Sequence, residues 1–229
     1  MHITYDLEDH ERRAPIRRAL IELIEHARGD DPVGSFRILD VGCGVGLLMR
    51  DLVDLGYEVA GTDLDERCVK EGSKYGPCKI ADIMDLETEL AGETFDLTVL
   101  SHVLEHIPSP IEAVRVLKRV SSQWIVLAVP NPGRPHIFMK YSLTSRDYSN
   151  RGHVYSWDRS HFTNFLTQFV GLEIVAWSSD GVRFLPGRLV RSPLRRLGLL
   201  DRIEGAVGRR FPYLSTSLIV LCRIPSAES

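Results

Sequence analysis

The sequence predicts an α/β fold built on a mostly parallel sheet. Short apolar runs, typical of buried strands, alternate with amphipathic helical patterns between residues 36 and 178. Such alternation produces right-handed βαβ units, whose strands run parallel. Alternating glycines at Gly42, Gly44 and Gly46 follow the first strand, and they indicate a ligand site at its carboxyl end.

The elements can be placed in order along the chain. An N-terminal helix is expected at 9–27, where apolar residues share one face. Further helices are expected at 47–53, 66–75, 111–120 and 160–169. Strands are expected at 38–41, 57–63, 78–81, 95–100, 124–129, 173–177 and 216–222. Prolines, a glycine and aromatic residues interrupt this pattern at 131–157, which predicts an irregular, lid-like insertion.

Length and composition limit the class of protein. A chain of 229 residues fits a single domain, 1–229. Its net charge of -3 implies no global attraction to nucleic acid. The four cysteines show no metal-ligand spacing, which suggests a reducing cytoplasm, and no apolar run reaches the roughly 20 residues that span a bilayer. We therefore expect a cytoplasmic protein.

The glycine turn and its flanking acids indicate which ligand binds. Its pattern is D-x-G-x-G-x-G, beginning at Asp40, whereas a dinucleotide site has G-x-G-x-x-G and would need a glycine at Leu47. A carboxylate at Asp40 suits a ligand that carries a cation and would repel a pyrophosphate. The next strand ends on Asp63, whose carboxylate can accept two hydrogen bonds from ribose hydroxyls.

Three stretches resemble one protein family. The run Asp40–Gly46 resembles the first motif of class I S-adenosylmethionine-dependent methyltransferases. Phe95-Asp96 and the stretch 101–110 resemble the segment that follows their fourth strand, and 152–162 is similar to a segment of ubiquinone-type small-molecule members. The resemblance implies a Rossmann-like, doubly wound, seven-stranded and mostly parallel sheet with an antiparallel last strand. It also implies S-adenosyl-L-methionine as the cofactor.

The resemblance implies a set of cofactor contacts. Asp82 would accept a hydrogen bond from the adenine amino group, Ile83 would cover the ring, and Ser101 would border the methionine end. Asp82 has an alternative role as the cap of the next short helix. The full implied set is Asp40, Gly42, Cys43, Gly44, Gly46, Asp63, Leu64, Asp82, Ile83, Ser101 and His102.

Two histidines follow the fourth strand. His102 to His106 fits the pattern H-x-x-E-H of zinc proteases, but Pro108 and Pro110 stop any helix within a turn, so no metal ligands are expected. His102 is a candidate for cofactor contact, or it holds the loop by hydrogen bonds. His106 is a candidate catalytic base, because imidazole titrates near neutral pH, or it holds the loop by hydrogen bonds.

A third histidine lies in the lid-like insertion. His153 is the best candidate for a base or an orienting group on the substrate side. Tyr155 and Trp157 would then shape an apolar pocket. The alternative is a lid that is packed by its own aromatic residues.

The segment 183–210 is strongly basic. It contains eight arginines and two acids, interleaved with leucines and other apolar residues. A basic amphipathic helix is typical of a membrane surface or an acidic partner. The alternative is a solvated helix that packs on the domain.

These observations predict methyl transfer from S-adenosylmethionine to a small-molecule or lipid-linked acceptor, with oxygen favoured over nitrogen or carbon. Ser101–Leu104 stands where amide-nitrogen methylases of DNA have Asn-Pro-Pro-Tyr, which argues against a nucleic-acid substrate. Two alternatives remain. One is a catalytically silent module that binds the cofactor and serves a partner protein, and the other is a nicotinamide-dependent oxidoreductase, against which Asp40 and Leu47 argue.

Overall fold

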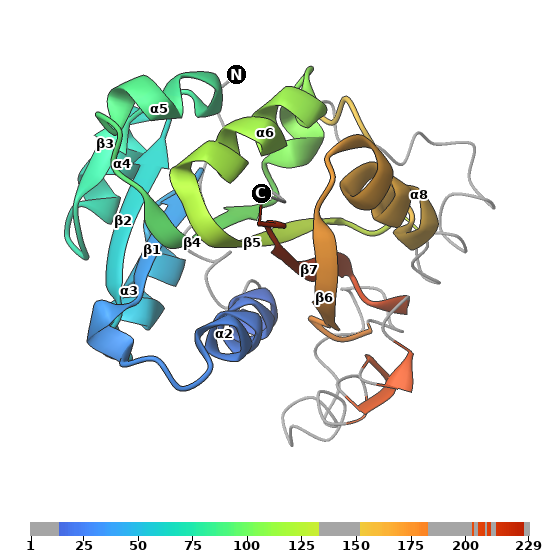
Figure 1. Ribbon diagram of the computed structural model, residues 1–229. Coiled ribbons are helices and arrows are strands. Elements are labelled where there is room, and N and C mark those ends of the chain that lie inside the picture. The colour runs from blue at the N-terminus through green and yellow to red at the C-terminus, as the bar shows by residue number, and fades with distance from the viewer. Residues whose placement is uncertain are drawn as a thin grey trace.

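The computed structural model describes residues 14–132, 152–182, 203, 206–208, 210–211 and 214–226. These residues form one seven-stranded sheet in the order β3-β2-β1-β4-β5-β7-β6 (Figure 1). The strands are β1 Arg37–Val41, β2 Glu58–Asp63, β3 Cys78–Ile80, β4 Phe95–Ser101, β5 Ser121–Pro130, β6 Glu173–Ser178 and β7 Ser217–Arg223.

The strand directions confirm the expected topology. The pairs β1–β2, β2–β3, β1–β4 and β4–β5 are parallel. The last strand of the chain, β7, inserts between β5 and β6 and is antiparallel to both. The predicted doubly wound sheet with an antiparallel last strand is therefore confirmed.

Helices cover both faces of the sheet. Figure 1 shows α2 and α3 below the sheet, and α5, α6 and α8 above it. The α-helices are α2 Ala14–Arg28, α3 Leu47–Asp54, α4 Glu66–Gly72, α5 Leu86–Glu89, α6 Pro110–Val120 and α8 Arg159–Asn164. Short turns of other helical types lie at η1 Val33–Ser35, η2 Ile83–Asp85, η3 Leu104–His106 and η4 Phe165–Phe169.

The two faces have separate apolar cores. Along β1, Ile38 packs with α2 and α3, whereas Leu39 and Val41 pack with the helices on the opposite face. This alternation follows from the period-2 geometry of a strand. Because both faces are covered, the central strands are almost wholly apolar, which is the pattern that the sequence shows.

The order of the strands places one ligand-binding position at the edge of the sheet where the strands end. The chain winds outward from β1 to β2 and β3 on one side, and from β4 to β5 on the other. The loops that follow β1 and β4 therefore leave the sheet side by side, at the topological switch point where α/β folds bind ligands. These loops are Gly42–Gly46 and His102–Ser109.

Some expected elements differ in extent or fall partly outside the described residues. The helix expected at 66–75 ends at Gly72, and the one expected at 160–169 continues from α8 into a π-helical turn at Phe165–Phe169. For the helix expected at 9–27 only the part from Ala14 onward is described. Most of the insertion 131–157 and of the basic segment 183–210 lies outside the described residues. In the part of the chain that is described, no helix is long and apolar enough to cross a membrane.

Candidate functional site

The glycine turn after β1 requires its glycines. Gly42, Gly44 and Gly46 have φ values of 71°, 55° and 77°, in the left-handed region that disfavours side chains. A Cβ on Gly42 would lie 2.4 Å from a methyl carbon of Val103, and one on Gly46 would lie 2.7 Å from the Cα of Gly72. The turn therefore brings the backbone close to both the β4 loop and α4.

Asp63 holds this turn in place. One carboxylate oxygen accepts a hydrogen bond from the Gly44 N–H at 2.8 Å, and the other accepts one from the Asp65 N–H at 2.9 Å. A carboxylate has about four acceptor sites, so both oxygens can still accept hydroxyl groups of a ligand. The predicted ribose contact is compatible with this geometry, but the structural role of Asp63 was not evident from the sequence.

Asp40 is a buried carboxyl group beneath the turn. The residue is 3% exposed. Burial, and then the charge of Asp63, raise the pKa of Asp40 from 3.8 to about 7. A ligand that places an ammonium group here would supply the missing positive charge, and the α-amino group of S-adenosylmethionine is such a group.

The remaining predicted contacts on this side lie at the ends of β2 and β3. Leu64 is exposed, and Ile83 is buried in the core that includes α5 and α6. Asp82 caps the turn Ile83–Asp85, because its Oδ1 accepts a hydrogen bond from the Met84 N–H at 2.9 Å. The capping role is therefore observed, while the contact between Asp82 and adenine stays a prediction.

Two cysteines meet behind the glycine turn. The sulfur atoms of Cys43 and Cys78 lie 3.5 Å apart, and both thiols are free. This hydrogen bond, burial and the charge of Asp40 raise the pKa of the Cys43 thiol. Cys43 thus packs beneath the loop and contributes its backbone to the turn, where its N–H donates to the Thr62 carbonyl at 2.9 Å.

The loop after β4 carries a strained histidine. His102 has a φ of 57°, which is rare for a residue other than glycine. Its N–H donates to the Ala128 carbonyl at 2.8 Å, and its Nε2 lies 3.1 Å from the Ser217 hydroxyl. Positive φ at His102 and the short turn Leu104–His106 exclude the long helix of an H-x-x-E-H protease site.

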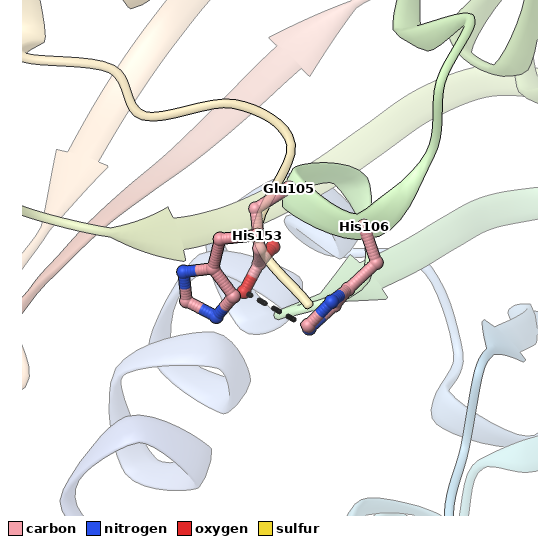
Figure 2. Close-up of side chains that lie close together, drawn as sticks. All are labelled: Glu105, His106 and His153. Atoms are coloured by element: carbon pink, nitrogen blue, oxygen red, sulfur yellow. Dashed lines mark ion pairs between the residues drawn. The ribbon is translucent and has the colours of Figure 1, made fainter. Parts of the chain in front are cut away.

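Glu105, His106 and His153 meet at this loop (Figure 2). The carboxylate of Glu105 is buried, and its Oε1 lies 3.5 Å from His102 Nδ1 and 4.0 Å from His106 Nε2. The rings of His106 and His153 pack edge to face, with their centroids 4.8 Å apart. One ligand atom from each of Glu105, His106 and His153 lies within 4.8 Å of the others, so the three could hold a metal ion. The sequence did not predict this cluster.

The segment Gly152–Trp157 is fastened to the same loop. The main-chain N–H groups of Val154 and Tyr155 both donate to the Glu105 carbonyl, at 2.8 and 3.2 Å. His106 Nδ1 contacts the Gly152 carbonyl at 2.9 Å. Trp157 stacks on Tyr155 and is buried against Phe162 of α8 and Phe165 of η4, so this end of the insertion packs on the helix that follows it.

Comparison with known proteins identifies the family. Residues 9–176 match the family described as "Methyltransferase domain". The chain is 35% identical over 86 residues to the ubiquinone biosynthesis O-methyltransferase of Bordetella avium (strain 197N), covering 34% of this chain and 35% of that protein. It is 36% identical over 92 residues to that of Xanthomonas axonopodis pv. citri (strain 306), covering 37% and 38%. These matches span little more than a third of the relatives' length.

A solved structure agrees in fold. Magnesium protoporphyrin IX methyltransferase from Synechocystis PCC 6803 with bound SAH superposes with a TM-score of 0.65 and 16% identity, covering 98% of this chain and 90% of that one. The family match extends over more than half of the chain, and it agrees with the strand order and with the glycine turn. The chain therefore belongs to the class I S-adenosylmethionine-dependent methyltransferases.

Proposed function

We propose that this protein transfers the methyl group of S-adenosylmethionine to an oxygen atom of a small-molecule or lipid-linked acceptor. The observation that carries the proposal is the meeting of two loops at the switch point of the sheet. One loop holds the glycine turn above Asp40. The other holds Glu105 and His106, and its hydrogen bonds to the segment Gly152–Trp157 bring His153 to the same place. Cofactor-binding features thus lie beside groups that can accept a proton.

On the cofactor side, the chain supplies the glycine turn and the carboxyl groups of Asp40 and Asp63. The positive φ values of the three glycines let a ligand approach the backbone, and Asp40 favours a cationic ammonium group. Asp63 has remaining acceptor capacity for ribose hydroxyls. When bound, S-adenosylmethionine supplies an activated methyl group, so the protein's main task is to align the acceptor with it.

On the acceptor side, His106 and His153 are the proposed bases. Because a carbonyl only accepts hydrogen bonds, His106 Nδ1 donates to the Gly152 carbonyl, and the neutral ring then carries its lone pair on Nε2. That nitrogen faces the cluster with Glu105 and can take a proton from an acceptor hydroxyl. A base matters for oxygen acceptors because a neutral hydroxyl is a weak nucleophile.

The class of acceptor follows from two further observations. The matched relatives from Bordetella and Xanthomonas are O-methyltransferases of ubiquinone biosynthesis, which supports an oxygen acceptor. The basic segment 183–210 interleaves arginine with leucine, which suits a surface of anionic headgroups and therefore a lipid-linked acceptor. Together, these two features support a hydrophobic acceptor that carries a hydroxyl group.

The test measures cofactor binding and methyl transfer separately. Purified protein is titrated with S-adenosylmethionine by calorimetry and is then incubated with tritiated cofactor and fractionated cell metabolites, including the lipid fraction. We expect binding and transfer of label to an organic-soluble product. Binding without transfer to any fraction would instead support the silent module.

Two histidine variants test the acceptor side. His153→Ala should lower transfer by about 10²-fold or more, as loss of a general base does, while cofactor affinity stays unchanged. His161→Ala is the matched control, because His161 lies on α8 and pairs with Asp158 outside the cluster. Equal transfer rates for the two variants would exclude His153 as the base.

A further inference from the structure

We propose that Glu105, His106 and His153 bind a divalent first-row transition-metal ion, with Zn²⁺ as the probe, on the acceptor side of the site. Figure 2 shows the three side chains converging from two segments: Glu105 and His106 come from the turn after β4, and His153 comes from the tethered segment beside it. In sequence the two segments are 46 residues apart at the His106–Gly152 contact.

A hydrogen bond fixes the orientation of the His106 ring. Its Nδ1–H donates to the Gly152 carbonyl, as histidines that bind metals commonly do to a backbone carbonyl or carboxylate. The neutral ring therefore presents the lone pair of Nε2 toward Glu105, 4.0 Å away. A lone pair that faces a carboxylate at this distance makes no hydrogen bond, and it leaves room for a cation between the two groups.

The carboxyl group of Glu105 is buried and has few partners. This residue is 1% exposed, and in the described part of the chain its Oε2 atom has no hydrogen-bond partner. Its Oε1 atom contacts histidine nitrogens at 3.5 and 4.0 Å, which is long for charge-assisted hydrogen bonds. A buried carboxylate without close partners is costly, because the protein interior solvates its charge far less well than water does. A cation at this position removes that cost.

The ring of His102 lies between Ser217 and Glu105. The Ser217 hydroxyl donates its only hydrogen to Asp180 Oδ2 at 2.8 Å, so at the 3.1 Å contact His102 Nε2 is the donor. Its other ring nitrogen, Nδ1, lies 3.5 Å from Glu105 Oε1. Nitrogen atoms of His102 and His106 thus both lie near one buried carboxylate. The strained backbone of His102 keeps it there, and strain of this kind concentrates at functional sites.

The donor set indicates the class of metal. Two imidazoles and one carboxylate, with a position left open, form the ligand set of many catalytic zinc sites, and they also suit iron, cobalt or manganese. Magnesium and calcium prefer oxygen ligands alone. In a tetrahedral zinc site, neighbouring ligand atoms lie roughly 3.3 Å apart, so groups already within 4.8 Å need only small side-chain rotations.

The role of this metal rests on the proposed function. The open coordination position would take the hydroxyl oxygen of the acceptor, and the metal would favour release of its proton. In the metal-bound chain this action would replace the base role of His106 and His153, because their lone pairs then hold the ion. The oxygen then forms a bond to the methyl carbon as the carbon–sulfur bond breaks, the sulfonium becomes a thioether, and the hydroxyl proton passes to water. The metal is unchanged, so no further reactant is needed.

The experiment measures metal binding by the full chain without reference to activity. Protein stripped with a chelator is titrated with Zn²⁺ against a chromophoric competitor, and Co²⁺ is added to a second sample to read coordination from its visible spectrum. We expect one Zn²⁺ per chain and a Co²⁺ spectrum of four-coordinate nitrogen and oxygen ligands. Zinc should raise the melting temperature of the wild-type chain, because a ligand that binds the native state stabilises it.

Variants locate the site. His153→Ala, which removes a partly exposed side chain, and Glu105→Gln should each weaken Zn²⁺ binding by about tenfold or more. His161→Ala should bind like the wild type. Cys78→Ser tests the thiol pair as a competing zinc site, and loss of binding in this variant alone would overturn the proposal, as would unchanged binding in His153→Ala.

Cofactor binding and methyl transfer are measured in parallel. Zinc bound at the cluster without methyl transfer to any acceptor would leave the metal site standing and would refute the proposed function. Methyl transfer that survives chelation, together with no specific Zn²⁺ binding, would refute the metal site and leave the proposed function standing.

Discussion

Replacing Asp40 with asparagine should abolish the pH dependence of cofactor binding. In the wild-type chain, burial and the charge of Asp63 raise the pKa of Asp40 from 3.8 to about 7. The shift is about three pH units, which corresponds to about 4 kcal/mol of preference for the protonated form in the folded, cofactor-free chain. An asparagine side chain has no proton that titrates in this range, and its shape is almost the same.

The raised pKa of Asp40 determines how the unfolding free energy changes with pH. Because the folded-state pKa of Asp40 lies above its unfolded value, its contribution to stability is full below about pH 4 and is lost as the pH rises through about 7. The cofactor-free wild type should therefore lose up to about 4 kcal/mol of unfolding free energy over this range, and Asp40→Asn should not.

Cofactor binding reverses this preference. The ammonium group of S-adenosylmethionine stabilises the carboxylate, so binding below about pH 7 releases a proton from Asp40. The dissociation constant should fall by about tenfold per unit between roughly pH 5.5 and 7, and should then level off.

Calorimetry in two buffers with different ionisation enthalpies measures both the affinity and the proton release. Asp54→Asn, an exposed change on α3, is the matched control and should behave like the wild type. The reasoning is refuted if wild-type binding releases no proton, or if Asp40→Asn keeps the same slope of affinity against pH.

Further substitutions test the ribose contact, the glycine turn and the basic segment. Asp63→Ala should weaken cofactor binding by about 2–4 kcal/mol and also lower the unfolding free energy, since its carboxylate holds two backbone N–H groups; calorimetry and urea unfolding check this, and normal binding by the folded fraction would make Asp63 purely structural. Gly46→Ala should destabilise the fold by about 2–4 kcal/mol in urea unfolding, because its Cβ would lie 2.7 Å from the Gly72 Cα. Gly92→Ala, with φ of 80° and open space, should lose only about 1–2 kcal/mol; equal losses would remove the steric argument. Replacing four arginines of the segment 183–210 with glutamine should reduce co-sedimentation with anionic vesicles at low salt, by about 1 kcal/mol per charge, and unchanged sedimentation would argue for a packing helix. The four are Arg195, Arg196, Arg209 and Arg210.

The sequence alone determined the fold class and the glycine turn after the first strand, because both depend on local patterns. Runs such as Trp124–Val129 are apolar at every position, which is typical of strands covered on both faces. Glycine spacing is equally local, since backbone conformation at positive φ selects glycine directly. The order of the strands was available only through resemblance to a family, because periodicity carries no information about neighbours in a sheet.

Only the tertiary structure decided how the acceptor side is built. His106 meets Gly152 and His102 meets Ser217, across 46 and 115 residues, and no local pattern encodes contacts over such separations. The same holds for Val154, whose main-chain N–H donates to the Glu105 carbonyl. A conformational preference is a property of a few consecutive residues. A site is a property of loops that the strand order brings together, so the cluster at Glu105 emerged only when the chain was folded.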